Sequence, residues 1–395
     1  MRKLIAGLTL LLGAALTALP AGAQTPYEIH VMLALTGGGA FLGQAEQKSL
    51  QLAEKVVNES GGIQGTPVKF TFHDDQTSPQ VAVQVANQIL ATKPQVLLGS
   101  SIVATCSAIG PLMQSGPVEY CFSPGIHPSG GSYVFTASVS THDLAIALVR
   151  YFRMKGWTKL AIMTSTDASG QDAENNLKEV VAMPENKDKG VAIVENAHFN
   201  TSDVSVTAQI ERVKAAKPQA FIAWSTGAPV ATVFRGIQQA GLDIPVGTTD
   251  GNMTYAQMNQ FAAFLPKRLY IPASQWVALE NPTIKLDPAV QKAQQAYYKV
   301  FKDAGLQPEV SSELAWEPAM IVIDALRKLG TKANATQIRD YIAHLKGFAG
   351  VNGIYDFTKT AQRGLDIDNA VVTSWNPQSK LWEPVSKLTG IPLDQ

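Results

Sequence analysis

The chain has little of what several classes of protein require. Its 32 basic residues are balanced by 32 acidic ones, and it has only two cysteines. Nucleic acids and anionic membranes are bound through basic patches, so we expect neither as a partner. After residue 23 no segment has the ~20 consecutive apolar residues that a membrane span needs.

Motifs of enzymatic chemistry are also missing. The chain has no GxSxG, no HExxH, no phosphate-binding P-loop and no Cys/His cluster with metal spacing. The spacing Gly37-x-Gly39-x-x-x-Gly43 is one residue off a dinucleotide fingerprint, and no acidic residue follows at a strand end ~20 positions on. We therefore expect a protein that is not an enzyme, with no cofactor and no metal.

The N-terminus has the pattern of a secretory signal. Arg2 and Lys3 precede the apolar run Leu4–Leu19, and Ala21-Gly22-Ala23 offers small residues for cleavage. We expect a signal peptide over residues 1–23, because the apolar run is short for a membrane anchor. Without Arg2 and Lys3, 30 basic and 32 acidic residues remain. We expect this mature chain outside the cytoplasm, in the periplasm if the host has two membranes.

Short β-rich apolar runs alternate with helical patterns along most of the chain. The predicted strands are 29–35, 68–73, 95–99, 118–122, 159–164, 190–199, 220–224, 244–248 and 268–273, with a β-rich tail over 371–384. The predicted helices are 45–59, 80–92, 141–155, 172–181, 205–216, 229–240, 287–304, 313–329 and 335–345. Strand–helix–strand repetition predicts an α/β fold with parallel sheets, and the length favours two domains.

In open α/β sheets, ligands bind beyond the carboxyl ends of the strands. Six loops at such ends are rich in Gly, Ser and Thr: 35–43, 99–106, 123–128, 165–171, 224–229 and 249–252. Turns use the same residues, so one such loop is weak evidence. Six together indicate a cleft with backbone N–H and hydroxyl donors, which suit a carboxylate. Since the six loops contain no Lys or Arg, we expect capture by neutral donors.

Four motifs carry a resemblance to a known family: Leu35-Thr-Gly-Gly-Gly-Ala-Phe-Leu-Gly43, Asn58-Glu-Ser-Gly-Gly-Ile-Gln-Gly65, Asp74-Asp75 followed by Ser78-Pro79, and Ser123-Pro124-Gly125. They resemble the motifs of the type I periplasmic solute-binding proteins of branched-chain amino-acid ABC importers, such as leucine/isoleucine/valine-binding proteins. The match runs from about residue 28 to about residue 385.

This resemblance implies two similar doubly wound parallel-sheet lobes with a cleft between them, which closes by hinge bending. It implies three crossovers, placed near Ser140, Pro272 and Val351. The expected lobes are 26–139 plus 273–350 and 140–272 plus 351–390. The implied role is delivery of a solute to an ABC permease in the membrane, by a protein that we expect to be a monomer. A sensory module of the same fold is the alternative.

The resemblance also assigns positions in the ligand site. The residues that hold an amino acid in that family fall on Val103, His127, Ser169, Thr226 (or Gly227) and Asp250. Only Asp250 has the residue type that the family uses at its position, an acidic residue that pairs with the ammonium of the substrate. The sequence therefore departs from the pattern of an ordinary leucine-binding protein. Asp250 would pair an ammonium or accept from a hydroxyl, or else form an Asx turn or helix cap.

Further residues of the loops complete the expected site. Backbone N–H groups near Ala104 and Gly125, with the hydroxyls of Ser101 or Thr105, would hold a carboxylate at a helix N-terminus. His127 would donate to it, or would serve as a structural loop residue. Apolar walls, if these side chains are not simply core, would come from Phe41, Leu42, Trp224 and Trp276. We therefore expect a small carboxylate ligand: an aromatic acid, a keto acid or an amino acid.

The sequence is compatible with two states of Cys106 and Cys121. In an oxidising compartment they would form a disulfide, and otherwise they would be two buried thiols.

Overall fold

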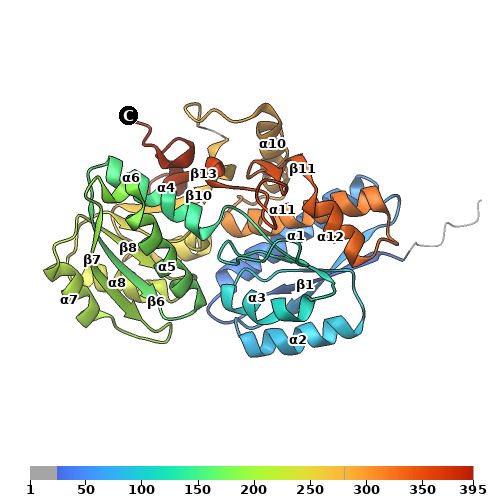
Figure 1. Cartoon of the computed structure of the whole chain (residues 1–395), viewed down its shortest axis with the longest axis horizontal. Helices are drawn as coiled ribbons and strands as arrows, with labels where there is room; N and C mark the ends of the chain where they lie inside the picture. The colour runs from blue at the N-terminus through green and yellow to red at the C-terminus, as the bar shows by residue number, and fades with distance from the viewer. Residues whose placement is uncertain (1–24, 280, 395) are drawn as a thin grey trace, which may run out of the picture.

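A computed structural model describes residues 25–279 and 281–394, and the predicted signal peptide lies outside them. The chain forms two α/β lobes that lie side by side (Figure 1). Within the described part, no helix is long and apolar enough to cross a membrane.

The first lobe is built on a five-stranded parallel sheet in the order β2-β1-β3-β4-β5. Its strands are β1 Tyr27–Leu33, β2 Val68–Asp74, β3 Val96–Leu98, β4 Val118–Cys121 and β5 Val134–Thr136. The helices between them are α1 Ala40–Glu59, α2 Pro79–Ala91 and α3 Val103–Ile109. Side chains alternate across β1, so Val31 packs in the core with Leu50 of α1, and Met32 packs with Ile89 of α2.

The second lobe is built on a seven-stranded sheet in the order β14-β13-β10-β9-β8-β6-β7. Its parallel strands are β6 Lys159–Ser165, β7 Ala192–Phe199, β8 Ala220–Trp224, β9 Val246–Gly247 and β10 Leu269–Ser274. The antiparallel strands β13 Ala370–Asn376 and β14 Leu381–Pro384 complete one edge. The helices along this stretch are α4 Thr141–Met154, α5 Ala168–Ala182, α6 Pro184–Lys187, α7 Thr207–Ala215, α8 Val230–Gln239 and α9 Tyr255–Phe261.

The last third of the chain completes both lobes. It contributes α10 Pro288–Asp303, α11 Val310–Leu329, α12 Ala335–Ala343 and the hairpin of β11 Lys346–Ala349 and β12 Ile354–Asp356. Helix α11 packs along α1 on the first lobe (Figure 1). The Thr136 N–H still donates to the Gln362 carbonyl at 2.9 Å, and the chain joins the second sheet at Ala370. These contacts place the third crossover between Arg363 and Ala370, later than its predicted position near Val351.

Local chemistry explains where the helices begin. The Ser78 hydroxyl accepts from the Val81 N–H, and Pro79 occupies the first position of α2, where its missing N–H costs nothing. The Ser140 hydroxyl accepts from the Asp143 N–H and starts α4 at the first crossover. These caps fix the helix ends that face the cleft.

Candidate functional site

A small cavity lies where the two lobes meet. Its volume is about 20 Å³, which is room for roughly one water molecule. It is lined by Leu42, Ser101, Val103, Ser123, Pro124, Gly125, Thr141, Ser169, Trp224, Thr226, Thr249, Asp250, Gly251 and Leu314. We call it the inner cavity. Both sheets contribute to its walls through the loops at the carboxyl ends of their strands.

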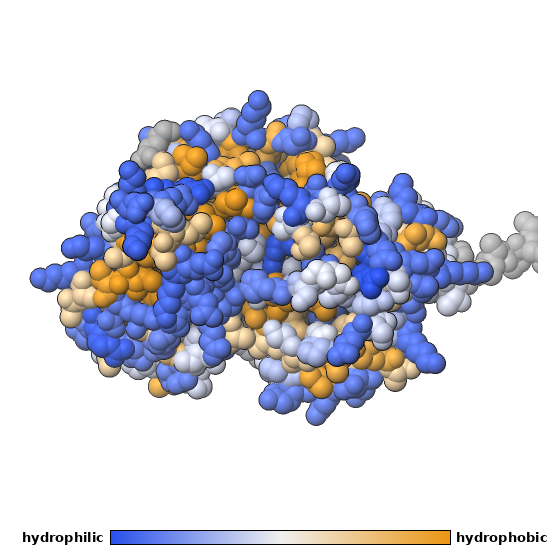
Figure 2. Space-filling view, viewed as in Figure 1, coloured by the Kyte–Doolittle hydropathy of each residue, from blue (hydrophilic) through white to orange (hydrophobic). Residues whose placement is uncertain are grey.

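A larger cavity of about 480 Å³ lies outward of it. This vestibule is lined by Gly38, Gly39, Gln76, Thr77, Pro79, Ile102, Val103, Ala104, Asp167, Ser169, Thr201, Ser202, Thr226 and Pro229. It shares Val103, Ser169 and Thr226 with the inner cavity. The two spaces are therefore neighbouring parts of one cleft, and the outline of the molecule is indented where the lobes meet (Figure 2).

Direct contacts hold the lobes against each other. The Ala228 N–H donates to the Gly38 carbonyl oxygen at 3.1 Å. The His127 Nε2 and Asp172 Oδ1 atoms are 2.7 Å apart, joining the loop after β4 to α5. Phe41 of α1 meets Phe261 of α9 edge to face, with ring centroids 6.0 Å apart. The structure is thus a closed arrangement of the two lobes.

Asp250 is the charged residue of the inner cavity. Its Oδ1 accepts from the Thr249 hydroxyl at 2.9 Å and from the Gly251 N–H at 2.8 Å, whereas its buried Oδ2 has no hydrogen-bond partner among the described residues. Burial raises the pKa of this carboxyl to about 6. The free oxygen can accept from an ammonium or hydroxyl of a ligand, or carry a proton.

The remaining polar groups of the cavity are neutral. The Ser169 and Thr226 hydroxyls are 2.9 Å apart. The buried Ser101 hydroxyl meets no partner at hydrogen-bond geometry, although it lies close enough to Glu46 to favour that carboxyl's charged form. Burial dominates nonetheless and raises the pKa of Glu46 to about 8. The wall at Ser101 is therefore backed by a carboxyl that is largely neutral at pH 7.

A buried cation lies behind the cleft. Arg363 donates through Nη1 to the carbonyls of Ala137 and Ser138, and through Nη2 to those of Pro124 and Ile126. Burial lowers its pKa to about 10, so the guanidinium stays charged at pH 7. It adds positive potential to the loop after β4. The six-loop pattern could not reveal it, because Arg363 lies in the C-terminal third of the chain.

The structure brings most of the predicted ligand residues together. Those that line the inner cavity are Leu42, Ser101, Val103, Gly125, Ser169, Trp224, Thr226 and Asp250. Ala104 lines the vestibule only. Three others lie outside both spaces: Phe41 and His127 make the lobe contacts described above, and the Thr105 hydroxyl donates to the Ile102 carbonyl within α3.

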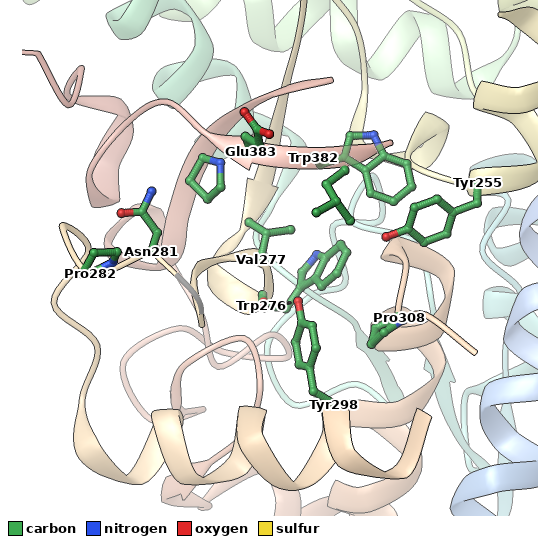
Figure 3. A pocket seen from close by; sticks show the side chains of 11 residues that line it. Tyr255, Trp276, Val277, Asn281, Pro282, Tyr298, Pro308, Trp382 and Glu383 are labelled. Carbon is green, nitrogen blue, oxygen red and sulfur yellow. Dashed lines mark hydrogen bonds between the residues drawn. The ribbon is translucent and has the colours of Figure 1, made fainter. Parts of the chain in front are cut away.

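Trp276 lies elsewhere. It follows β10 and lines a separate pocket of about 380 Å³, together with Tyr255, Tyr298, Trp382 and others (Figure 3). The expectation that it walls the cleft is not met, because the chain turns into a 3₁₀ segment, Gln275–Ala278, directly after the strand.

Sequence reasoning missed several lining residues. Thr249 and Gly251 flank the predicted Asp250, and Ser123 and Pro124 belong to the Ser123-Pro124-Gly125 motif. The sequence could therefore have predicted these four residues. Thr141 begins α4, and Leu314 lies in the second turn of α11. Neither Thr141 nor Leu314 follows a predicted strand, because both belong to helices that border the cleft.

Cys106 and Cys121 form a disulfide. It ties α3 to the end of β4 and so joins the bases of two loops that line the cleft.

The fold and the cleft are those of a two-lobed binding protein. Residues 26–379 match the family described as periplasmic binding protein, and the chain belongs to it. A curated relative, Leu/Ile/Val-binding protein homolog 1 of Brucella abortus, is 24% identical over 342 residues, covering 84% of this chain and 85% of the relative.

Solved structures share the fold. An extracellular ligand-binding receptor from Rhodopseudomonas palustris HaA2 aligns with a TM-score of 0.80 at 20% identity, covering 91% of this chain and all of that one. The solute-binding protein of an R. palustris ABC transporter, in complex with benzoate, aligns with a TM-score of 0.75 at 17% identity, covering 93% and 97%. These proteins are named for binding rather than for catalysis.

Proposed function

We propose that the chain is the extracytoplasmic solute-binding component of an ABC importer, and that it captures a small carboxylate with an apolar or aromatic side group. The observation that carries this proposal is the lining of the inner cavity. Leu42, Val103, Trp224 and Leu314 supply apolar walls, and Asp250 is the charged residue there. Such a mixture, mostly apolar with a few placed polar groups, is typical of small-molecule sites.

Hinge closure is the proposed means of capture. The inner cavity alone holds about 20 Å³, too little for an organic acid, so we expect the lobes to part, to admit the acid across the inner cavity and the adjoining vestibule of about 480 Å³, and then to close around it. The bodies that move in this proposal are residues 26–139 with 273–363 and residues 140–272 with 370–390. The main-chain contact between Ala228 and Gly38 would break and reform in each cycle.

The ligand's carboxylate would lie against the loop after β4. Neutral donors surround this position, and the Arg363 guanidinium behind the Pro124 and Ile126 carbonyls gives it positive potential. The resemblance to the benzoate-bound R. palustris protein supports a carboxylate without an ammonium. The valine at position 103, where amino-acid binders have a serine, points the same way.

A hydrophobic amino acid is the second candidate. The unpartnered Oδ2 of Asp250 favours it, because an ammonium would satisfy this atom. The name of the Brucella relative also supports it.

A thermal-shift panel tests the proposal. We would heat the protein with benzoate, phenylpyruvate, leucine or phenylalanine, because only a ligand of the folded state raises the melting temperature. We expect at least one of the two acids without an ammonium to raise it by several degrees at a hundredfold excess over Kd. A response to leucine and phenylalanine alone would reject the preferred ligand class and leave the amino-acid candidate. Mass spectrometry of co-purified small molecules gives an independent identification.

A further inference from the structure

Three buried side chains form a closed ring of polar contacts at the hinge. Glu313, in the first turn of α11, has its Oε1 3.2 Å from the Ser274 Oγ. That Oγ lies 2.6 Å from the Asn352 Oδ1. The Asn352 Nδ2 in turn donates to the Glu313 Oε2 and closes the ring. All three residues are inaccessible to solvent or nearly so.

The number of hydrogens that this ring needs determines whether the Glu313 carboxyl is protonated. Three contacts need three hydrogens, and the Ser274 hydroxyl supplies one. The amide of Asn352 presents its oxygen to one neighbour and its NH₂ group to the other, so it supplies one hydrogen whichever way it is turned. The third hydrogen must come from Glu313. An ionised Glu313 would leave two acceptors facing each other within a buried cluster, which is costly.

The ring lies where the connections between the lobes converge. Ser274 ends β10 and opens the second crossover. Ser138, in the first crossover, has its hydroxyl 3.4 Å from the same Glu313 Oε1. Gln275, next to Ser274, donates to the Asn352 carbonyl at 3.1 Å and to the Asn369 Oδ1 at 2.8 Å, and Asn369 belongs to the third crossover. One buried network thus contacts all three connections.

The same residue adjoins the ligand cavity. Leu314, directly after Glu313, lines the inner cavity. The 3₁₀ segment Asp250–Asn252 packs against α11. Any shift of Glu313 would therefore move a cavity wall and the segment that carries Asp250.

The surroundings of Glu313 agree with a neutral acid. Burial raises the pKa of its carboxyl well above the usual range, and the nearby Asp250 and Glu317 carboxyls raise it further, while Asn352 and Ser274 act in the opposite direction. The hydroxyls of Tyr297 and Tyr355 lie close enough to interact with it. Glu317 itself is buried, with its pKa raised to about 7.

We propose that Glu313 is a positioning residue for solute capture: as a neutral acid it closes the Glu313–Ser274–Asn352 ring, and the ring holds the three crossovers in the closed arrangement. The role of Glu313 in capture rests on the proposed function. Its protonation and the hydrogen-bonded ring are independent of that function, because both exist without a ligand. Ionisation of Glu313 would open the ring and loosen the hinge.

Infrared difference spectroscopy tests the proton directly. At pH ~9 most carboxyl groups, including those with pKa values near 7, have lost their proton. We expect the spectrum of the ligand-free protein minus that of Glu313→Gln to show the C=O stretch of a protonated carboxyl group. The matched control is Glu309→Gln, which alters a partly buried acid at the start of α11 whose pKa is raised only to about 7. This control should not remove the band. A difference spectrum with only carboxylate bands would overturn the proposal.

Hydrogen exchange tests the ring. Glutamine at position 313 supplies the same third hydrogen through its amide, so Glu313→Gln should keep exchange at residues 138–140, 274–276 and 364–369 within about threefold of wild type. Glu313→Ala removes the ring and should speed exchange there by about tenfold or more, with the core strands unchanged. Equal exchange in the two variants would refute the positioning role. If no compound in the thermal-shift panel binds, the proposed ligands are rejected, but the infrared and hydrogen-exchange results stay valid.

Discussion

At the scale of single residues, Asp250 decides between the two ligand classes. One of its oxygens is held by Thr249 and Gly251, and the other is buried without a partner. Because burial raises its pKa to about 6, the carboxyl is mostly charged at pH 7 but accepts a proton in mildly acidic solution. A ligand with an ammonium gains from the charge, whereas a ligand with only a carboxylate is repelled by it.

We predict opposite pH profiles for the two ligand classes. Affinity for a carboxylate without an ammonium should fall as pH rises through about 6, by up to about tenfold per unit, since Asp250 becomes charged. Asp250→Asn should remove this dependence and bind such an acid at least as well at pH 8. Calorimetric titration of the acid found by thermal shift checks this. An amino acid would instead lose about tenfold or more affinity in the same variant.

Asp250 also affects stability. Its folded-state pKa lies above the ordinary pKa of 3.8 for an aspartate, so its contribution to stability is fully present below pH 3.8 and is lost as pH rises through about 6. By pH 8 the buried charge costs at most about 3 kcal/mol of unfolding free energy. Asp250→Asn should therefore be more stable than wild type at pH 8, and nearly equal to it at pH 4, in urea unfolding monitored by fluorescence. A variant less stable at pH 8 would contradict this account.

At the scale of elements, the strand ends could be predicted and the helices that reach the cleft could not. The predicted strand over residues 220–224 is β8 itself, and the loops after β4 and β8 do line the cavity. β5 was missed because Val134–Thr136 is too short for a pattern of alternation. Leu314 comes from a helix and lies 190 residues after Pro124 and 90 residues after Trp224, so only tertiary packing brings it to the cavity.

The pair of His127 and Asp172 joins a loop of the first lobe to α5 of the second. The His127 side chain is 52% exposed, so the contact is worth about 1 kcal/mol at most. We predict that His127→Ala weakens ligand binding up to about fivefold, mainly through faster release, because the pair forms only when the lobes are closed. Stopped-flow release kinetics measure this.

The matched control is His198→Ala, which breaks a similar pair with Glu174 inside the second lobe. It should leave the release rate unchanged. If both variants release ligand at the same rate as wild type, His127 has no part in holding the cleft closed.

At the scale of the whole molecule, the closed form depends on close main-chain contact between the lobes. Gly227, in the loop after β8, has φ of +82°, and a Cβ atom there would lie 2.5 Å from the Gly38 carbonyl oxygen of the other lobe. Neither glycine lines the inner cavity. The requirement for glycine at 227 is therefore a requirement of closure rather than of ligand contact.

We predict that Gly227→Ala impairs closure. The variant should bind the ligand at least about tenfold more weakly, since either the lobes stay apart or the contact is strained. Small-angle scattering at saturating ligand should show a larger radius of gyration than for wild type. The control is Gly241→Ala: Gly241 also has positive φ, at +62°, but a Cβ there would meet nothing within 4 Å. Both variants should lose about 1 kcal/mol of stability from the backbone conformation alone. Only Gly227→Ala should lose affinity, and equal affinities would mean that the lobes do not need this contact to capture a solute.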